Sequence, residues 1–299
     1  MTSRIVDFKE AHRYSAWPAR INGTAAWAKR VQSADENYRE YEEDIYGPQL
    51  RIWEEDDALP GGSPARFYFS QLVDLADKNN KRQNIHGSTS SEWLCSMGNQ
   101  LVVMDFIEAN LFYRQVVVRR LSEYVRGRNI VEIGCGTGIN LFNLASTIPC
   151  GELVGCDLSG SAVAIGNGLA AKYGVSARFF ECNAFELSEF DALLQMESEY
   201  VIVTCHTVER VGTTLVEGIL GLTRKPRLVI HCEPLDLGWD DDMTAWQRRY
   251  CELNGYCIDL LAVVRAFEEL GRLRVQALVP RMFGLSAFHP TSLVAWSPT

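Results

Sequence analysis

The sequence of 299 residues lacks several features that mark common protein classes. No run approaches the roughly 18 consecutive apolar residues that a membrane-spanning helix needs, and the first ten residues contain no apolar stretch typical of a secretory signal. The nine cysteines form no Cys-x-x-Cys pair, and most lie in apolar runs. We therefore expect buried free thiols rather than disulfides or a zinc site, no metal ion, and a cytoplasmic protein without a membrane partner.

Positive charge is also scarce, since the net charge is −9. A protein that binds nucleic-acid backbones needs a basic face, so we expect no nucleic-acid partner. Between Asp35 and Asp57, ten acidic residues stand against two basic ones, and this segment carries eight of the nine net negative charges. If this segment covers a site, its charge favours a cationic cofactor or acceptor over an anionic one.

The second half of the chain alternates short apolar runs with helical patterns. Apolar strands separated by helices predict an α/β fold with a doubly wound parallel sheet that is covered on both faces. The predicted strands are 129–134, 153–157, 177–181, 200–205 and 227–232, followed by 272–279 and 292–296. The predicted helices are 139–147, 159–173, 186–195, 213–223 and 258–270.

The N-terminal part has a different pattern, which predicts a mainly helical extension over residues 1–118. Residues 35–55 mix charges with aromatic and aliphatic residues, as an amphipathic helix does, with an interruption at Gly47-Pro48. A helix breaker at 59–64 and a polar loop at 77–91 follow, and a long helix is predicted over 100–125.

The most informative stretch is a strand that runs into three alternating glycines and then a helix. Gly134, Gly136 and Gly138 follow the first predicted strand, which also contains Glu132. Each glycine removes a Cβ and permits positive φ, so the backbone can pass close to a ligand. In a nicotinamide-binding loop the third glycine would stand at Ile139, and the Gly-Lys-Ser/Thr of a nucleotide phosphate loop is absent.

Two further residues follow the next two strands. Asp157 ends the second strand, which places its carboxylate beside the glycine loop at the edge where open α/β sheets bind ligands. A carboxylate there can accept hydrogen bonds from both hydroxyls of a ribose, and Asn183 after the third strand can bond to an adenine edge, flanked by Phe185. Taken singly, the glycines can make only a tight turn and Asp157 can simply cap a helix.

Together, the Glu-x-Gly-x-Gly-x-Gly run of residues 132–138, Asp157 and the pair Asn183-Ala184 resemble the class I S-adenosylmethionine-dependent methyltransferases of the small-molecule type. The resemblance covers about residues 119–299, and the family more often has an acid at the position of Asn183. It implies a seven-stranded sheet in the order 3-2-1-4-5-7-6 with strand 7 antiparallel, S-adenosyl-L-methionine as cofactor, and the N-terminal extension as a lid. The implied cofactor contacts are Glu132, Gly134, Gly136, Gly138, Asp157, Leu158, Asn183, Ala184 and His206.

Polar residues at the ends of the fourth and fifth strands are the catalytic candidates. His206 and Glu209 follow strand four and Glu233 follows strand five, so we expect all three near the transferred methyl group. An imidazole is a suitable general base for a hydroxyl or ammonium acceptor. The alternatives are that His206 only shapes the pocket and that Glu209 serves the N-terminus of the next helix.

Substrate-binding candidates lie on both sides of the predicted sheet edge. Glu233, Asp236 and Trp239 belong to an acidic stretch that can hold a cationic acceptor, although the aspartates nearby can equally cap the following helix. On the helix before the first strand, Arg114 can clamp a substrate carboxylate, with Tyr113 beside it, or can be an ordinary surface residue.

These features predict a methyltransferase acting on a small polar molecule, and the first hypothesis is N-methylation of an amino-acid-like or guanidino substrate such as arginine. O-methylation of a natural-product hydroxyl with His206 as base is the alternative, and a catalytically silent cofactor-binding partner protein is the second. A homodimer is left open. The aromatic residues that can line a lid, or pack in the core, are Tyr38, Tyr41, Tyr46, Trp53, Phe67, Tyr68 and Trp93.

Overall fold

The computed structural model describes most of the chain. The described residues are 3–55, 63–64, 67–71, 73, 92–187, 189–196 and 198–299. The helix breaker at 59–64 lies largely outside this part, and the polar loop at 77–91 lies wholly outside it. No helix in the described part is long and apolar enough to cross a membrane.

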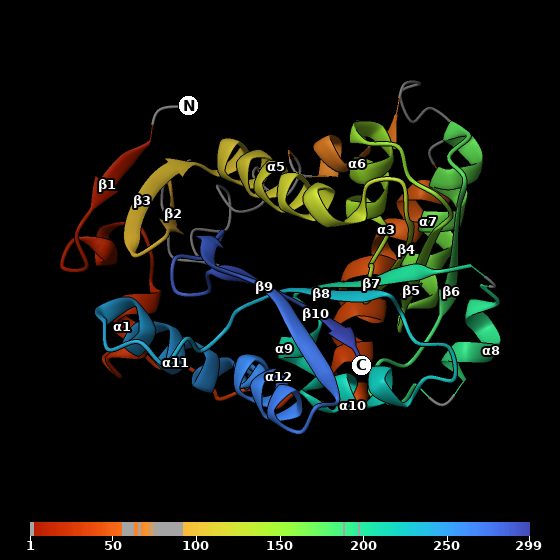
Figure 1. Ribbon diagram of the computed structural model, residues 1–299. Helices are drawn as coiled ribbons and strands as arrows, with labels where there is room; N and C mark the ends of the chain where they lie inside the picture. Colours follow the sequence, from red (N-terminus) through yellow and green to blue (C-terminus); the bar gives the residue numbers. More distant parts are fainter. Residues whose placement is uncertain are drawn as a thin grey trace.

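A seven-stranded sheet forms the centre of the fold (Figure 1). Its strands are β4 (Asn129–Ile133), β5 (Leu153–Asp157), β6 (Ala177–Glu181), β7 (Tyr200–Cys205), β8 (Leu228–Glu233), β9 (Leu273–Phe283) and β10 (Thr291–Pro298). The order across the sheet is β6-β5-β4-β7-β8-β10-β9, and β10 is antiparallel to both of its neighbours. Counted from β4, this is the order 3-2-1-4-5-7-6 with strand 7 antiparallel, so the predicted fold is confirmed.

Helices cover both faces of this sheet, which explains why its strands are apolar on both sides. Residues of β4 show the alternation, because Ile130 packs into one core and Val131 and Ile133 into the other. The helices of the first core are α5 (Phe106–Val125), α6 (Ile139–Thr147) and α7 (Gly160–Tyr173). Those of the second are α8 (Phe190–Leu194), which is shorter than predicted, α10 (Thr214–Gly221) and α12 (Leu260–Glu269).

A second sheet in the N-terminal part was not predicted from the sequence. Its strands, in the order β1-β3-β2, are β1 (Arg4–Val6), β3 (Gln100–Asp105) and β2 (Glu92–Met97). The helix predicted over 100–125 was therefore wrong for its first six residues. Gly98, at a φ of 58°, turns the chain so that β2 and β3 pair as a hairpin, and α5 begins only at Phe106, where Asp105 caps its first turn. From there α5 continues through the predicted boundary between residues 118 and 119.

The first residues of the chain pack against a helix from its C-terminal part. The elements in contact are η1 (Ala11–Arg13), α1 (Trp17–Ile21) and α11 (Asp242–Asn254). The rings of Trp17 and Tyr250 meet edge to face with centroids 4.4 Å apart. Asp241 caps α11 by accepting the N–H of Thr244 at 2.7 Å, so one of the aspartates near Trp239 has the capping role that was the alternative reading.

The acidic N-terminal segment forms a helical cap beside the sheet edge, and we call residues 34–55 the cap segment. Its parts are α2 (Ala34–Tyr38), the π-helical η2 (Arg39–Tyr46) and α3 (Gly47–Glu55). The interruption predicted at Gly47-Pro48 is a change from π- to α-helical winding, which Pro48 tolerates because its missing N–H falls in the first turn of α3. A Cβ on Gly47 would lie 2.5 Å from the carbonyl oxygen of Glu42, so glycine is required there.

Glu42 attaches the cap segment to the N-terminus of α7. Its carboxylate accepts the N–H of Ser161 at 3.0 Å and the hydroxyls of Ser159 at 2.5 Å and Ser161 at 2.6 Å. Burial opposes its charge, but these hydrogen bonds outweigh burial and lower the pKa of Glu42. A carboxylate at a helix N-terminus is also stabilised by the helix dipole.

We expect Glu42→Gln to lower stability by about 1 kcal/mol, because the charge at the N-terminus of α7 is lost. This corresponds to a fall in melting temperature of roughly 2–4 °C, measurable by calorimetry. Limited proteolysis should also cut the cap segment faster. Glu43→Gln, which changes an exposed neighbour, is the matched control, and equal melting temperatures for the two variants would contradict this role.

Candidate active site

The loop between β4 and α6 holds the three predicted glycines in positive-φ conformations. The φ angles are 71° at Gly134, 54° at Gly136 and 86° at Gly138, the last of which is the N-cap of α6. A Cβ on Gly136 would lie 2.4 Å from the hydroxyl oxygen of Tyr46, and one on Gly134 would lie 2.2 Å from that of Thr207. Real Cβ atoms do not come so close, so both the backbone conformation and the packing require glycine.

Asp157 lies beside this loop, as predicted. Its Oδ2 accepts the N–H of Gly136 at 2.7 Å and its Oδ1 accepts the N–H of Ser159 at 3.0 Å. Burial raises the pKa of Asp157 even though these backbone hydrogen bonds favour the carboxylate. The side chain therefore holds the glycine loop in place and presents a partly desolvated carboxylate at its edge.

A cavity of about 370 Å³ extends over the glycine loop and the ends of the neighbouring strands. Leu158, Ala184 and Phe185 line it on the side where an adenine was predicted. Asn183 lies outside the described lining, because its side-chain oxygen accepts the backbone N–H of Phe185 at 3.0 Å. The amide of Asn183 therefore shapes the turn that carries its neighbours, and Asn183 takes no part in the cavity wall.

The cap segment closes one side of this cavity with Tyr41 and Tyr46. The other aromatic residues considered for a lid pack elsewhere or face solvent. Trp53 packs against Gly168 of α7, and Tyr38 is exposed. The residues buried in the described cores are Phe67, Tyr68 and Trp93.

Glu132 lies beneath the loop and is almost fully buried. Asn140 donates to its Oε1 at 2.7 Å, whereas Oε2 has no hydrogen-bond partner among the described residues. Burial raises the pKa of Glu132 to about 8, and the hydrogen bond from Asn140 only partly opposes this. The carboxyl group is therefore buried, and its Oε2 can still form a hydrogen bond.

We expect Glu132→Gln to stabilise the ligand-free protein at high pH. A carboxyl group whose pKa rises from 4.5 to about 8 on folding favours the folded state below pH 4.5 and loses this contribution as pH rises to about 8. The variant removes this loss, so its melting temperature relative to the wild type should increase between pH 5 and pH 8.5. The exposed Glu217→Gln is the control, and parallel pH dependences for wild type and Glu132→Gln would refute the expectation.

His206 and Glu209 lie at the opposite end of the cavity from the adenine side. His206 lines the cavity after β7, at a φ of 57°, and Glu209 is buried in α9 (Val208–Val211). The Nδ1 of His206 is 3.0 Å from Glu209 Oε2, and its Nε2 is 2.7 Å from Thr291 Oγ1. Burial lowers the pKa of His206, but the Glu209 carboxylate outweighs burial and raises it, while the pKa of Glu209 is lowered.

Glu233 supports this end of the cavity from beneath. It is fully buried outside the described lining, and its Oε1 accepts the N–H groups of Thr207 and Val208 at 2.9 and 3.1 Å. Thr204 Oγ1 donates to the same oxygen at 2.8 Å. Burial, with the nearby Glu209 carboxylate, raises the pKa of Glu233 to about 7. These contacts give Glu233 the role of holding the turn that carries His206.

The residues that line the cavity match the expected substrate-binding set only in part. Arg114, Tyr113 and Arg210 line it, and Asp157 is the one acid among the described lining residues. Asp236 instead forms two hydrogen bonds with Arg248 at 2.7 and 2.9 Å. Trp239 is 42% exposed and stacks on Arg281, so both substrate candidates of the acidic stretch lie outside the described lining.

Several site residues had no recognisable sequence signal. Arg210 reaches Glu40 of the cap segment at 2.7 Å and its guanidinium lies over Tyr41. His289 belongs to the segment between β9 and β10 and lies 2.7 Å from Glu209. No local spacing connects either residue to the glycine loop, because contacts between distant segments create these positions.

Part of the chain matches a known protein family. Residues 130–216, from β4 into α10, match the family model described as a methyltransferase domain. The match falls on the part of the sheet that carries the glycine loop and Asp157. This part of the chain is a methyltransferase domain, and the sheet has the strand order implied by the resemblance to the class I S-adenosylmethionine-dependent methyltransferases.

This methyltransferase is similar to several solved structures at low identity. Magnesium protoporphyrin IX methyltransferase from Synechocystis PCC 6803 shares 13% identity over 65% of this chain and 85% of that chain, with a TM-score of 0.47. Geranyl diphosphate C-methyltransferase from Streptomyces coelicolor A3(2) shares 14% over 64% and 81%, with a TM-score of 0.42. The pyocyanin biosynthetic protein PhzM shares 13% over 62% of this chain and 55% of that chain, with a TM-score of 0.46. A search of curated protein sequences gives no match.

The residues of this methyltransferase fit S-adenosyl-L-methionine as its cofactor. The glycine loop lies in the wall of the cavity with Tyr46 of the cap segment packed against Gly136, and Asp157 offers a carboxylate in the same wall. The unpartnered Oε2 of Glu132 is a buried acceptor beneath the loop. The Asp157 carboxylate suits a ligand that carries positive charge on sulfur and nitrogen.

Proposed function

We propose that this methyltransferase transfers the methyl group of S-adenosyl-L-methionine to a hydroxyl oxygen of a small-molecule acceptor. The observation that supports this choice is the pairing of His206 with a buried Glu209 at the end of the cavity away from the adenine side. When bound, the cofactor supplies an electrophilic methyl group on a sulfonium. The protein must then align and activate the acceptor oxygen.

In this proposal the cofactor lies along the cavity from β6 towards β7. Leu158, Ala184 and Phe185 enclose the adenine, and Asp157 accepts hydrogen bonds from the ribose hydroxyls. Gly134 and Gly136 allow the methionine part to approach the backbone closely. Tyr41 and Tyr46 of the cap segment exclude water from this side.

The acceptor then lies between α5 and the turn after β7. Tyr113 and Leu285 form the wall there. To act as base, His206 would exchange the contact of its Nε2 with Thr291 Oγ1 for the acceptor oxygen. Glu209 orients His206, and Glu233 fixes the backbone of the turn. Since alignment dominates methyl transfer, residues that fix His206 contribute to rate without contacting the acceptor.

The charges of the cavity favour this assignment over N-methylation of an arginine-like substrate. That hypothesis rested on an acidic rim formed by Glu209, Glu233 and Asp236, and none of the three is among the described lining residues. Arg114 lines the cavity and has no hydrogen-bond or ion-pair partner among the described residues; it contacts only the ring of Tyr68 at 5.7 Å. A free guanidinium repels a guanidinium acceptor and suits an acceptor with a carboxylate or a polar, uncharged group.

Product analysis by mass spectrometry decides between these acceptors. Purified protein with S-adenosyl-L-methionine should methylate members of a panel of phenols, hydroxy acids and sugars, and should leave arginine-like and amine acceptors unmodified. Methylation confined to the amine panel would overturn the O-directed proposal. Tight binding of the demethylated cofactor without turnover on either panel would favour the silent partner protein instead.

A further inference from the structure

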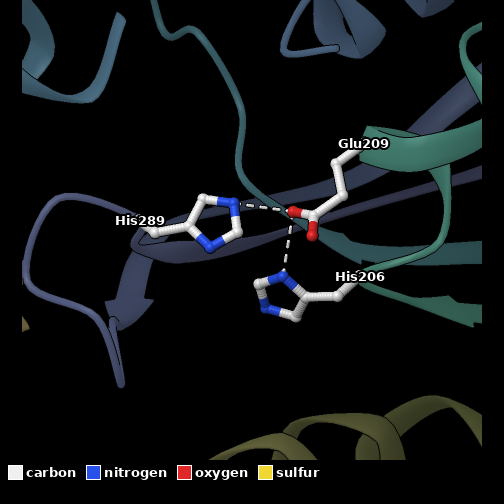
Figure 2. A group of neighbouring side chains, drawn as sticks. All are labelled: His206, Glu209 and His289. Carbon is white, nitrogen blue, oxygen red and sulfur yellow. Dashed lines mark hydrogen bonds and ion pairs between the residues drawn. The ribbon is translucent and has the colours of Figure 1, made fainter. Parts of the chain in front are cut away.

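Two side chains that are close in sequence and one that is distant meet in a cluster next to the cavity-lining His206 (Figure 2). His206 follows β7, Glu209 lies in α9, and His289 comes from the segment before β10. Both imidazoles face the same carboxylate oxygen, at 3.0 Å for His206 Nδ1 and 2.7 Å for His289 Nε2, and the three nearest ligand atoms lie within 4.8 Å of one another. Two imidazole nitrogens and a carboxylate oxygen at this spacing form a ligand set for a divalent transition metal.

Hydrogen bonding alone does not account for His289. Its Nε2 is buried and has no hydrogen bond of acceptable geometry among the described residues, although it is 2.7 Å from Glu209 Oε2. The ring is held by stacking on Tyr256 at 5.1 Å and by Tyr250 at 5.2 Å. Among the described residues this fixed, buried nitrogen faces the same carboxylate oxygen that His206 faces, and a shared cation would satisfy all three atoms.

The Nε2 atom of His206 has a hydrogen-bond partner, as the outer nitrogen of a metal-ligating histidine generally has. Its Nε2 lies 2.7 Å from Thr291 Oγ1, so an Nε2–H can donate to the hydroxyl and leave the Nδ1 lone pair free for the cluster. Metal ligands are generally oriented by a hydrogen bond of this kind from the outer nitrogen. Thr291, at the start of β10, can therefore accept the Nε2–H of the tautomer that binding requires.

The charges around the cluster are compatible with a cation. Glu209 supplies a carboxylate inside the cluster, and Glu233 lies beneath it. Arg210 is the opposing positive charge on α9, but its guanidinium is paired with Glu40 at 2.7 Å and packs on Tyr256. The net local charge therefore does not exclude a divalent ion.

We propose that His206, Glu209 and His289 bind a divalent transition-metal ion of the zinc class through Nδ1, Oε2 and Nε2. Three protein ligands would leave a coordination position open, and His206 also lines the cavity, so the proposed ion would lie next to the acceptor end. The sequence analysis expected no metal ion on the basis of the cysteines; this ligand set contains no cysteine, and the proposal departs from that expectation.

The catalytic consequence rests on the proposed function. Coordination lowers the pKa of an acceptor hydroxyl, whose proton passes to water. The acceptor oxygen then forms a bond to the methyl carbon, the carbon–sulfur bond breaks, and its electron pair stays on sulfur. The products are a methyl ether and the demethylated, uncharged cofactor.

Metal binding can be tested without any acceptor. The full-length protein is freed of metal with a chelator, dialysed against Zn²⁺ or Co²⁺, and measured by elemental analysis and, for Co²⁺, by visible absorption. We expect one ion per chain and a cobalt spectrum typical of mixed nitrogen and oxygen ligands. Loss of one ligand in His289→Ala or Glu209→Gln should weaken binding by at least about 100-fold, because changes to supporting residues alone cost 10–100-fold.

His12→Ala is the matched control, since His12 is an exposed histidine bonded to the Lys9 carbonyl and is not part of the cluster. It should bind metal as the wild type does. If His289→Ala does not fold, His289→Gln provides the same test, with folding checked by binding of the demethylated cofactor. Less than 0.1 ion per wild-type chain, or equal metal content in the wild type and the cluster variants, would overturn the metal site and leave the proposed methyl transfer standing.

Discussion

Asp157→Ala should weaken binding of the demethylated cofactor, S-adenosylhomocysteine, by about 100-fold or more. In the proposed complex the Asp157 carboxylate accepts the ribose hydroxyls, and hydrogen bonds to charged groups contribute about 1.5–3 kcal/mol each. Loss of two such bonds corresponds to at least two tenfold steps in the dissociation constant. The side chain also accepts the N–H groups of Gly136 and Ser159, so its removal loosens the glycine loop as well.

Isothermal titration calorimetry measures this effect directly. Asp236→Ala is the matched control because it removes an aspartate that is paired with Arg248 outside the described cavity lining, and its affinity should stay within about twofold of the wild type. Asp157→Asn separates the two roles of the side chain, since its amide oxygen can still accept one backbone N–H while the charge is lost. A wild-type dissociation constant for Asp157→Ala would show that the cofactor does not use this edge of the sheet.

His206→Asn should lower turnover by about 100-fold or more, whereas the affinity for S-adenosylhomocysteine should change far less. The side chain is proposed to act on the acceptor oxygen, and losing a group that activates a nucleophile typically costs 10²–10⁴-fold in rate. Asparagine is the appropriate replacement because His206 has a φ of 57°, and asparagine tolerates this left-handed conformation better than alanine does.

Single-turnover methyl transfer, followed by mass spectrometry with an acceptor from the hydroxyl panel, separates chemistry from binding. His12→Ala, which removes an exposed histidine, should keep wild-type turnover. A His206→Asn enzyme that retains its rate but binds the cofactor weakly would assign His206 to the cofactor. A loss of both properties together with a lower melting temperature would mean that His206 mainly holds the turn after β7.

The sequence predicted the central sheet well because its signals are local. Strands β5 and β6 and helix α6 have the bounds that the apolar runs indicate, since buried parallel strands and amphipathic helices carry their pattern in consecutive residues. Where a tertiary contact competed with a local pattern, the prediction failed. Residues 100–105 form β3 because Gly98 allows a hairpin with β2, and the apolar spacing alone did not reveal this pairing.

The sequence by itself therefore determined the fold class, and the resemblance carried by the glycine loop and Asp157 indicated the family and the cofactor, because these residues lie at fixed offsets from two adjacent strands. Only the tertiary structure decided which polar residues face the acceptor. It directs Glu233 beneath the turn, pairs Asp236 with Arg248, and brings His289 to Glu209 across 80 positions of sequence. The direction of a side chain and its long-range contacts depend on packing between elements. The buried charged residues of this site therefore show no periodic pattern in the sequence.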